Sequence, residues 1–139
     1  MIVIDASVAV KWFLPEPMSD AADAILDDDV VRVAPEHILV EVGQALLRAW
    51  RANGITLDAV QKAMDAVGEV VQLTSTRDFA TRAVAIAAEA SCTNYDALYV
   101  AVADTLGGTL LTADDRLIDR LKSTRWSDRV RHLRAPQDP

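Results

Sequence analysis

Short apolar runs alternate with longer amphipathic stretches along this chain. The runs have the length and the β-branched composition of strands, and they lie at residues 2–4, 30–34, 70–73, 109–112 and, more weakly, 130–133. Apolar residues recur at helical spacing over residues 19–28, 37–53, 57–68, 77–90, 95–106 and 115–123. Strands that alternate with helices need crossover connections. The pattern therefore predicts an α/β fold with a central parallel sheet of about four to five strands, flanked by helices on both faces.

Helix stop signals and the lack of a linker indicate a single domain. Gly54 follows one helical stretch, and the pair Gly107 and Gly108 follows another, as glycines often do after the last turn of a helix. No Pro-rich or Ser-rich segment divides the 139 residues, which is a length typical of one domain. We expect residues 1–134 to form that domain and residues 135–139, "APQDP", to form a short tail.

The first apolar run ends at a carboxylate. Ile2, Val3 and Ile4 lack the alternation of a one-sided strand, so they predict a strand that is buried on both faces. Asp5 follows at once, and burying a charge is costly unless it is paired or bound to metal. In open parallel sheets, binding sites form beyond the carboxyl ends of the strands. Asp5 is therefore a candidate for a functional carboxylate.

Three further acids raise the same question, and each has a local alternative. Asp114 follows the run at residues 109–112, but an Asp before "DRLIDRLK" is also a good helix N-cap. Asp96 opens a stretch that is apolar on almost every side, where Thr93 and Asp96 have the spacing of a capping box. Glu41 borders the apolar stripe of its helix, as a surface residue often does. If all four acids converge at one end of the sheet, they repel one another unless a cation holds them.

Composition excludes several other classes of protein and site. With 51% hydrophobic and 25% charged residues, the chain has the make-up of a soluble globular protein. Cys92 is the only cysteine, so no internal disulfide and no cysteine-based zinc cluster can form, which fits a reducing compartment. The longest stretch without a charge, residues 105–113, is too short to span a bilayer. We expect a cytoplasmic protein with no membrane segment.

Charge is distributed unevenly along the chain. Residues 1–115 hold 18 acidic and 7 basic residues, whereas residues 116–139 hold 3 acidic and 7 basic residues. An acidic body disfavours nucleic-acid binding by electrostatics alone, because that affinity comes largely from cations that neutralise phosphates. The basic run near the end either supplies such cations or forms a solvated face. Its members are Arg116, Arg120, Lys122, Arg125, Arg129 and Arg131. Asp104 falls on the polar side of its helix, and we expect it to be solvated.

The candidate ligands select a hard cation. Carboxylate oxygens without a cysteine or histidine cluster favour Mg²⁺ or Mn²⁺ over zinc. His37 and His132 lie far apart in the sequence and lack the spacing of metal ligands. No glycine-rich phosphate loop and no nucleophilic serine motif occurs in the chain. Ser7 either caps the helix after Asp5 or orients water at a metal, and we favour the cap.

Four segments, taken in order, resemble the motifs of one protein family. The segments "VIDASVAVKWFLPE", "EVGQALLR", "TNYDALYVAVAD" and "LLTADDRL" are similar in order and spacing to those of PIN-domain ribonucleases. The likeness is specifically to VapC-type toxins of type II toxin–antitoxin pairs, and it covers nearly the whole chain. It implies a PIN-like fold and an acidic catalytic quartet. Matched motif by motif, that quartet is Asp5, Glu41, Asp96 and Asp114.

The resemblance also implies an activity and partners. The expected activity is a Mg²⁺- or Mn²⁺-dependent endoribonuclease that hydrolyses RNA phosphodiester bonds, is neutralised by a VapB-type antitoxin and is usually a homodimer. Asp5, Asp96 and Asp114 would hold the metal, and Glu41 would either bind metal or position the attacking water. By the same match, Asp115 is an auxiliary acid and Thr112 lies close to the site.

Two alternatives come from other functional classes. A receiver-type phosphoacceptor domain is also α/β, but it needs an Asp after a central strand and a Lys after a late one. The runs at residues 70–73 and 130–133 are followed by neither. A catalytically idle PIN-like binding module is the second alternative, and the intact acids argue against it. Val40 and Leu47 lie away from the main apolar stripe of their helix and could form a contact face for a second copy or an antitoxin.

Overall fold

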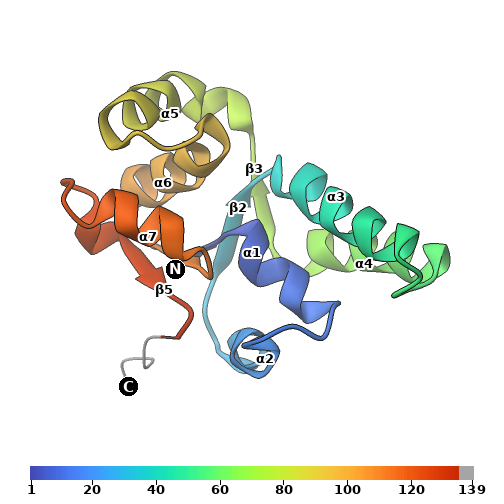
Figure 1. Ribbon diagram of the computed structural model, residues 1–139. Coiled ribbons are helices and arrows are strands. Elements are labelled where there is room, and N and C mark those ends of the chain that lie inside the picture. The colour runs from blue at the N-terminus through green and yellow to red at the C-terminus, as the bar shows by residue number, and fades with distance from the viewer. Residues whose placement is uncertain (135–139) are drawn as a thin grey trace.

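Five parallel strands form one sheet (Figure 1). The computed structural model describes residues 1–134, so the predicted tail at residues 135–139 lies outside the described residues. The strands stand in the order β3-β2-β1-β4-β5, and every neighbouring pair is parallel. Their bounds are β1 Ile2–Ile4, β2 Arg32–Pro35, β3 Gln72–Thr74, β4 Thr109–Thr112 and β5 Val130–His132. The predicted α/β fold with a central parallel sheet is confirmed.

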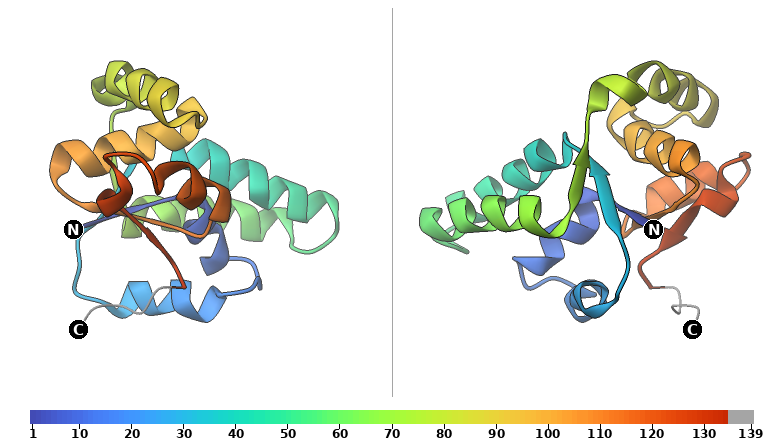
Figure 2. Two further views of the ribbon diagram at one scale, coloured as in Figure 1. Left: turned by 60° about the vertical axis from the view of Figure 1, so that its left-hand side comes forward. Right: turned by 180° about the vertical axis from the view of Figure 1, so that it is seen from behind.

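Helices connect these strands as crossovers and cover both faces of the sheet. Their bounds are α1 Ala6–Ala9, α2 Ser19–Asp27, α3 Ile38–Arg51, α4 Leu57–Val70, α5 Thr76–Ala90, α6 Asn94–Leu106 and α7 Asp115–Leu121, with short 3-10 turns η1 Val10–Trp12 and η2 Ser127–Arg129. Figure 2 shows α1, α3 and α4 on one side of the central strands and α5 and α6 on the other. Helix α6 packs on β1, β2 and β4, while α1 packs on β4 and α3. No helix within residues 1–134 is long and apolar enough to cross a bilayer.

The core explains why β1 and α6 occupy the middle of the fold. Val3 and Ile4 are fully buried between β2 and β4, as expected of a strand that is apolar on both faces. Every residue of α6 from Ala97 to Ala103 is buried, so this helix has no polar face in its middle. By contrast, β3 is an edge strand, and its Gln72 and Leu73 are exposed.

Most element bounds differ from the predicted ones by one or two residues, and two of these differences have an identifiable cause. Val70 ends helix α4, and the third strand begins only at Gln72, because the apolar residues at this point serve the helix face before the strand. Helix α3, which precedes Gly54, ends at Arg51. The residue that adopts the left-handed conformation after it is Asn53, at φ 58°, and not the glycine. Gly107 does end α6 as predicted, with φ 69°.

Candidate active site at the carboxyl ends of the strands

A reversal of chain direction places several acids at one edge of the sheet. From β1 the chain runs outward through β2 to β3, and it then returns to β4 on the other side of β1. Such a switch point opens a crevice at the carboxyl ends of the two adjacent strands. Asp5 follows β1 and Asp114 follows β4. Helix α3 leaves β2 at this edge with Glu41 in its first turn, and α6, which leads down to the start of β4, begins here with Asp96 in its first turn.

Asp5 is buried, and two hydroxyl groups hold its side chain. Ser7 Oγ donates a hydrogen bond to Asp5 Oδ2 at 2.7 Å, and Thr112 Oγ1 donates a short one to the same oxygen. Burial raises the pKa of Asp5 from its ordinary value of 3.8 to about 6; the two hydroxyls oppose this rise, and the charges of Glu41 and Asp96 add to it. Because both hydroxyls bond Oδ2, they leave Oδ1 available to another ligand.

Asp114 caps helix α7, as its position before that helix predicts. Its Oδ1 accepts hydrogen bonds from the backbone N–H groups of Arg116 at 2.8 Å and Leu117 at 3.3 Å. Its own N–H donates to Thr112 Oγ1 at 3.0 Å, which ties the capping residue to the hydroxyl that also bonds Asp5. Since the cap uses Oδ1, the second carboxylate oxygen does not take part in it. The capping role is thus compatible with a second role for the same side chain.

Asp96 lies half-buried in the first turn of α6. Thr93 caps this helix, because its Oγ1 accepts a hydrogen bond from the Asp96 N–H at 3.1 Å, and the predicted cap is confirmed. Partial burial raises the pKa of Asp96, and the charges of Asp114 and Glu41 raise it further against the opposing hydrogen bonds of Thr93. Asp96 is therefore linked electrostatically to two of the other three acids.

Two aromatic side chains, His37 and Tyr99, lie against Glu41. His37 Nε2 lies 2.8 Å from Glu41 Oε1, and Tyr99 donates its hydroxyl hydrogen to the same oxygen at 3.3 Å. The His37 and Tyr99 rings lie 4.6 Å apart between centroids, so they also pack on each other. Burial raises the pKa of Tyr99, and the charges of Asp5 and Glu41 act in the same direction, so the phenol stays protonated and acts as a donor. The Nε2–H of His37 donates its hydrogen bond to the Tyr95 carbonyl at 3.1 Å, so its approach to Glu41 is a close contact and not a second hydrogen bond. Glu41 Oε2 takes part in neither contact.

The charges of the other acids act on Asp5 and on Asp96, but within residues 1–134 the four acids do not form a preassembled metal site. Among residues 1–134, no three Asp, Glu, His or Cys side chains are grouped so that they could hold a metal ion as they stand. The donor set nevertheless has the oxygen-only chemistry that Mg²⁺ and Mn²⁺ prefer. In Asp5, Asp114 and Glu41, the side-chain hydrogen bonds described above all fall on one of the two carboxylate oxygens. The residues therefore fit such an ion chemically, and binding would require side chains to rotate toward it.

Ser7 does not cap the helix after Asp5, so that prediction is wrong. Helix α1 has no side-chain cap, and Ser7 Oγ instead accepts the backbone N–H of Ala113 at 2.9 Å while it donates to Asp5. The hydroxyl thereby joins the loop after β4 to the end of β1. The contacts of His37 and Tyr99 with Glu41 were not predicted either. The four-residue spacing of His37 and Glu41 on one helix was visible in the sequence, but the contact with Tyr99, 58 residues further on, was not.

Asp104 is not solvated, contrary to the prediction. Its side chain is 20% exposed and lies between Arg82, which donates to Oδ2, and Arg129, whose Nε is 3.9 Å from Oδ1. Trp126 Nε1 also donates to Oδ2, at 3.3 Å. The hydrogen bond from Arg82 is the main reason that the pKa of Asp104 is lowered. Through these contacts Asp104 links α6 to α5 and η2. The polar side of α6 therefore faces neighbouring elements at this point.

Most of the basic run is already engaged within the chain. Arg120 donates to the Ser91 carbonyl, Lys122 pairs with Asp119, Arg125 pairs with Glu89 and lies over the Trp126 ring, and Arg129 faces Asp104. Within the described residues, Arg116 and Arg131 have no ion pair. Arg116 is exposed in the first turn of α7, beside the cap of that helix.

Asp115 contacts the last strand and the residues that follow it. Its Oδ1 is 3.2 Å from His132 Nε2 and 3.7 Å from Arg134. Within the described residues, His132 Nε2 is buried and has no hydrogen-bond partner. Its approach to Asp115 is therefore a close contact without hydrogen-bond geometry. His132 and His37 lie at different places, and neither belongs to a metal-binding group within residues 1–134.

The chain is similar to known proteins in both sequence and structure. The family model described as the PIN domain matches residues 2–122. Ribonuclease VapC3 of Pyrobaculum aerophilum is 27% identical over 122 residues, which cover 86% of this chain and 93% of that protein. The crystal structure of PAE2754 from Pyrobaculum aerophilum is similar with a TM-score of 0.70 at 19% identity, covering 95% of this chain and 88% of that one. Mycobacterium tuberculosis VapC20, described as a Sarcin-Ricin loop cleaving toxin, gives 0.67 at 18% identity, covering 84% and 92%.

Proposed function

This chain belongs to the PIN domain family, and from that premise we propose that it is a metal-dependent endoribonuclease of the VapC toxin type. One observation carries the proposal. Asp5 is buried at the carboxyl end of the central strand, and the other three acids of the quartet lie close enough to influence its pKa or that of Asp96. A fold gains no stability from gathering like charges, so we attribute the cluster to function. Membership of the PIN domain family excludes the receiver-type alternative. An assay of RNA cleavage distinguishes the nuclease from the idle binding module.

Three of the acids are proposed to hold a divalent cation. Asp5, Asp96 and Asp114 would hold Mg²⁺ or Mn²⁺, because hard cations take carboxylate oxygens and keep several waters. When bound, such an ion supplies positive charge for the phosphodiester and lowers the pKa of water. The chain contributes rigidity: Ser7 and Thr112 fix the Asp5 carboxylate, and the helix cap fixes Asp114. Thr112 connects these two acids and is the positioning residue between them.

Glu41 is proposed to handle a proton. Tyr99 donates a hydrogen bond to Oε1 and His37 Nε2 lies 2.8 Å from the same oxygen, which leaves Oε2 to accept a proton from the attacking water. The pKa of Tyr99 is raised, which keeps its hydroxyl a donor to Glu41 over the whole working pH range. In this arrangement Glu41 positions and deprotonates the nucleophile while the other three acids hold the cation.

Replacing Asp114 by Asn separates its two roles. Asn and Asp are comparable N-caps, so Asp114→Asn keeps the cap of α7 and removes only the negative charge. We expect the variant to melt within a few degrees of the wild type and to lose cleavage of a mixed RNA pool in Mg²⁺ or Mn²⁺. The measurement compares purified wild type and variant, free of any partner, by denaturing gel, with EDTA as the blank.

Asp58→Asn is the matched control for this experiment. Asp58 is exposed on α4 and pairs only with Lys62, so its replacement removes the same charge away from the cluster and should leave cleavage unchanged. Equal cleavage by wild type and Asp114→Asn would contradict the proposal, and so would equal cleavage in Mg²⁺ and EDTA. A wild type that binds RNA but cuts none would support the idle binding module.

The RNA contact is proposed to use the cations that the chain leaves unpaired. Arg116 is the best placed, because it is exposed beside the Asp114 cap and has no ion pair in residues 1–134. Each lost phosphate contact flattens the salt slope of single-strand binding by about 0.7. Arg116→Ala should therefore weaken RNA binding more than Arg125→Ala, since Arg125 is already held by Glu89 and the Trp126 ring.

An antitoxin of the VapB type and a second copy of this chain are the proposed protein partners. Val40 is 73% exposed on α3 close to Glu41, so an apolar contact is available at the mouth of the acidic cluster. A basic side chain of the antitoxin would neutralise the acids in place of the cation. Co-expression with the neighbouring reading frame, followed by sedimentation, tests both partners; a monomer with no copurifying basic protein would contradict them.

A further inference from the structure

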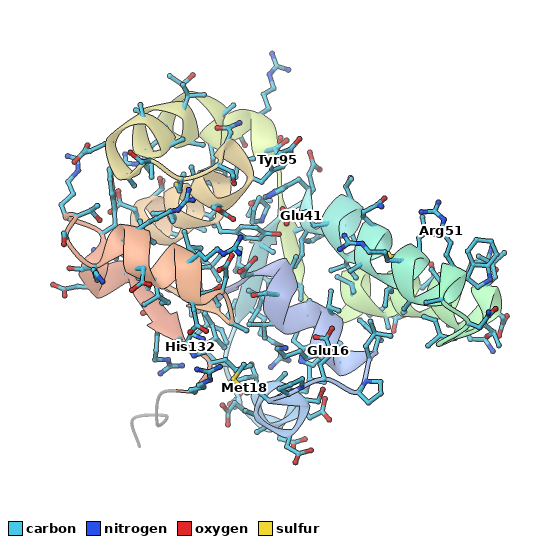
Figure 3. The ribbon with its side chains drawn as sticks, viewed as in Figure 1. Glu16, Met18, Glu41, Arg51, Tyr95 and His132 are labelled. Atoms are coloured by element: carbon cyan, nitrogen blue, oxygen red, sulfur yellow. The ribbon has the colours of Figure 1, made fainter. Side chains whose placement is uncertain are left out.

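A shallow depression beside Glu41 contains the features of a base-binding pocket. It has a volume of about 310 Å³, and its lining residues are Val40, Glu41, Gln44, Arg48 and Tyr95. Figure 3 shows Tyr95 and Glu41 next to one another where helices α3 and α6 begin. Glu41, Gln44 and Arg48 share one face of α3, because residues three and seven positions apart lie along the same side of a helix. The pocket thus contains a member of the acidic quartet.

Tyr95 presents an aromatic ring to solvent, and its backbone is held in place. The residue is 64% exposed, one position before Asp96, and its carbonyl accepts a hydrogen bond from His37 Nε2 at 3.1 Å. The His37 ring lies 6.3 Å from the Tyr95 ring with the planes inclined by 32°, and it packs on Tyr99 on its other side. Three aromatic rings therefore form a series from the buried Tyr99 to the exposed Tyr95. The Tyr95 ring is therefore exposed to solvent, while its backbone is held by His37.

We propose that this depression takes one nucleobase of single-stranded RNA, stacked on Tyr95, next to the phosphodiester held at the acidic quartet. The inference rests on the proposed function and assigns a subsite to it. Every base has a flat face that stacks on an exposed aromatic ring, and unpaired bases in RNA are recognised in this way. Gln44 offers an amide donor and acceptor to the base edge. Arg48 is exposed and has no ion pair within residues 1–134, so its guanidinium can bind the adjoining phosphate.

Other occupants fit the lining less well. A purely apolar partner would leave Glu41 and Arg48 desolvated without matching groups, which is costly. Glu41 in the lining would repel RNA, but Arg48 lines the same depression and supplies positive charge without any added cation. The subsite therefore makes RNA binding depend on stacking, which is insensitive to the acidic character of the body.

The test measures binding separately from cleavage. The probe is a fluorescein-labelled single-stranded 12-nucleotide RNA of mixed sequence, titrated in EDTA, where metal-dependent cleavage cannot occur, and followed by anisotropy. Tyr95→Ala should weaken binding by roughly 5- to 150-fold, while Tyr95→Phe keeps the ring and should stay within about two-fold of the wild type. Trp50→Ala is the matched control, because Trp50 is an exposed aromatic residue near the far end of α3.

A set of RNAs with a single abasic position identifies the stacked base. At one position, loss of the base should weaken wild-type binding and leave Tyr95→Ala unchanged, because the two changes remove the same contact. Equal effects of every abasic position on wild type and Tyr95→Ala would overturn the subsite. So would a Tyr95→Ala variant that binds RNA normally but no longer self-associates, since the depression would then be a protein interface.

Cleavage of the same RNA in Mg²⁺, measured in parallel, separates the two proposals. Binding that depends on Tyr95 without any cleavage supports the subsite and contradicts the nuclease. Cleavage with unchanged binding by Tyr95→Ala supports the nuclease and overturns the subsite. Failure of the wild type to bind the RNA at all overturns the subsite.

Discussion

Asp5 is buried and Asp104 is partly exposed, and the two carboxylates also differ in the sign of the charges around them. Asp104 contacts two guanidinium groups and an indole N–H, and the hydrogen bond from Arg82 is the main cause of its lowered pKa. Asp5 is held only by neutral hydroxyls, and its nearest charged influences are Glu41 and Asp96, so its pKa is raised. Both residues join separate elements of the fold.

The contrast shows that burial alone does not identify a functional acid. A carboxylate that is paired with cations stabilises the structure, as in the Asp104 cluster that joins α5 and α6 to η2. A carboxylate that is buried among other carboxylates costs stability, and the cost is retained when a function needs the charge. The sign of the neighbouring charges therefore separates the structural acid from the candidate catalytic one.

The largest expected difference between the two regions is in activity. Asp5→Asn removes a proposed cation ligand at nearly constant volume and should lower the rate of RNA cleavage by more than about 100-fold. Asp104→Asn should change that rate by no more than about two-fold, provided that the assay is run well below its melting temperature. Rates are measured on one labelled RNA in saturating Mg²⁺. Comparable losses in the two variants would erase the distinction between the regions.

The pH dependence of stability should have opposite signs in the two regions. The pKa of Asp5 is raised from 3.8 to about 6, so between these values the folded state holds a proton that the unfolded state has lost. Stability should therefore fall by on the order of 2 to 3 kcal/mol as the pH rises from about 4 to 7 in EDTA. The lowered pKa of Asp104 acts the other way, and its stabilisation is lost as the pH falls below 3.8. Urea titrations across this range should show a flatter profile for Asp5→Asn.

Asp104→Asn should destabilise the protein by about 1 to 2 kcal/mol, because hydrogen bonds to charged groups are lost. Arg82 and Arg129 lose their negative partner, while Trp126 Nε1 can still donate to the amide oxygen. Urea denaturation at pH 7 provides the measurement, and Asp58→Asn is the control for loss of an exposed charge. An unchanged midpoint would show that the Asp104 cluster does not stabilise the fold.

Asp5→Asn should have the opposite and smaller effect, raising stability in EDTA by on the order of 1 kcal/mol. The substitution removes one of the repelling charges and keeps the shape of the side chain. Saturating Mg²⁺ should raise the melting temperature of the wild type more than that of the variant, since a ligand bound only to the native state stabilises it. A lower melting temperature in EDTA, with an equal response to Mg²⁺, would reduce Asp5 to a local hydrogen-bond acceptor.

Much of the fold could be predicted from local patterns of apolar residues and helix caps in the sequence. The residues of β1 and β4 match the predicted runs, and Thr93 and Asp114 cap their helices as their positions predict, because a cap needs only neighbours within a few residues. Hydrophobic periodicity did not define the bounds of the short helix α1, since four residues are too few to display a period. Val70 was predicted to lie in a strand but is the last residue of α4. An apolar residue between a helix and a strand fits the pattern of either element.

By itself, the sequence determined the alternation of strands and helices, the central position of β1, and the acids that follow or border those elements. Only the tertiary structure decided which groups meet. Ser7 bonds Asp5 and the loop after β4, Tyr99 reaches Glu41 from another helix, and Arg82 reaches Asp104. Hydrophobic periodicity and capping are properties of short segments. Apart from the Ser7–Asp5 bond, these contacts join residues 22 to 106 positions apart through the packing of separate elements. The charges around a carboxylate, and with them its role, are therefore set by the fold.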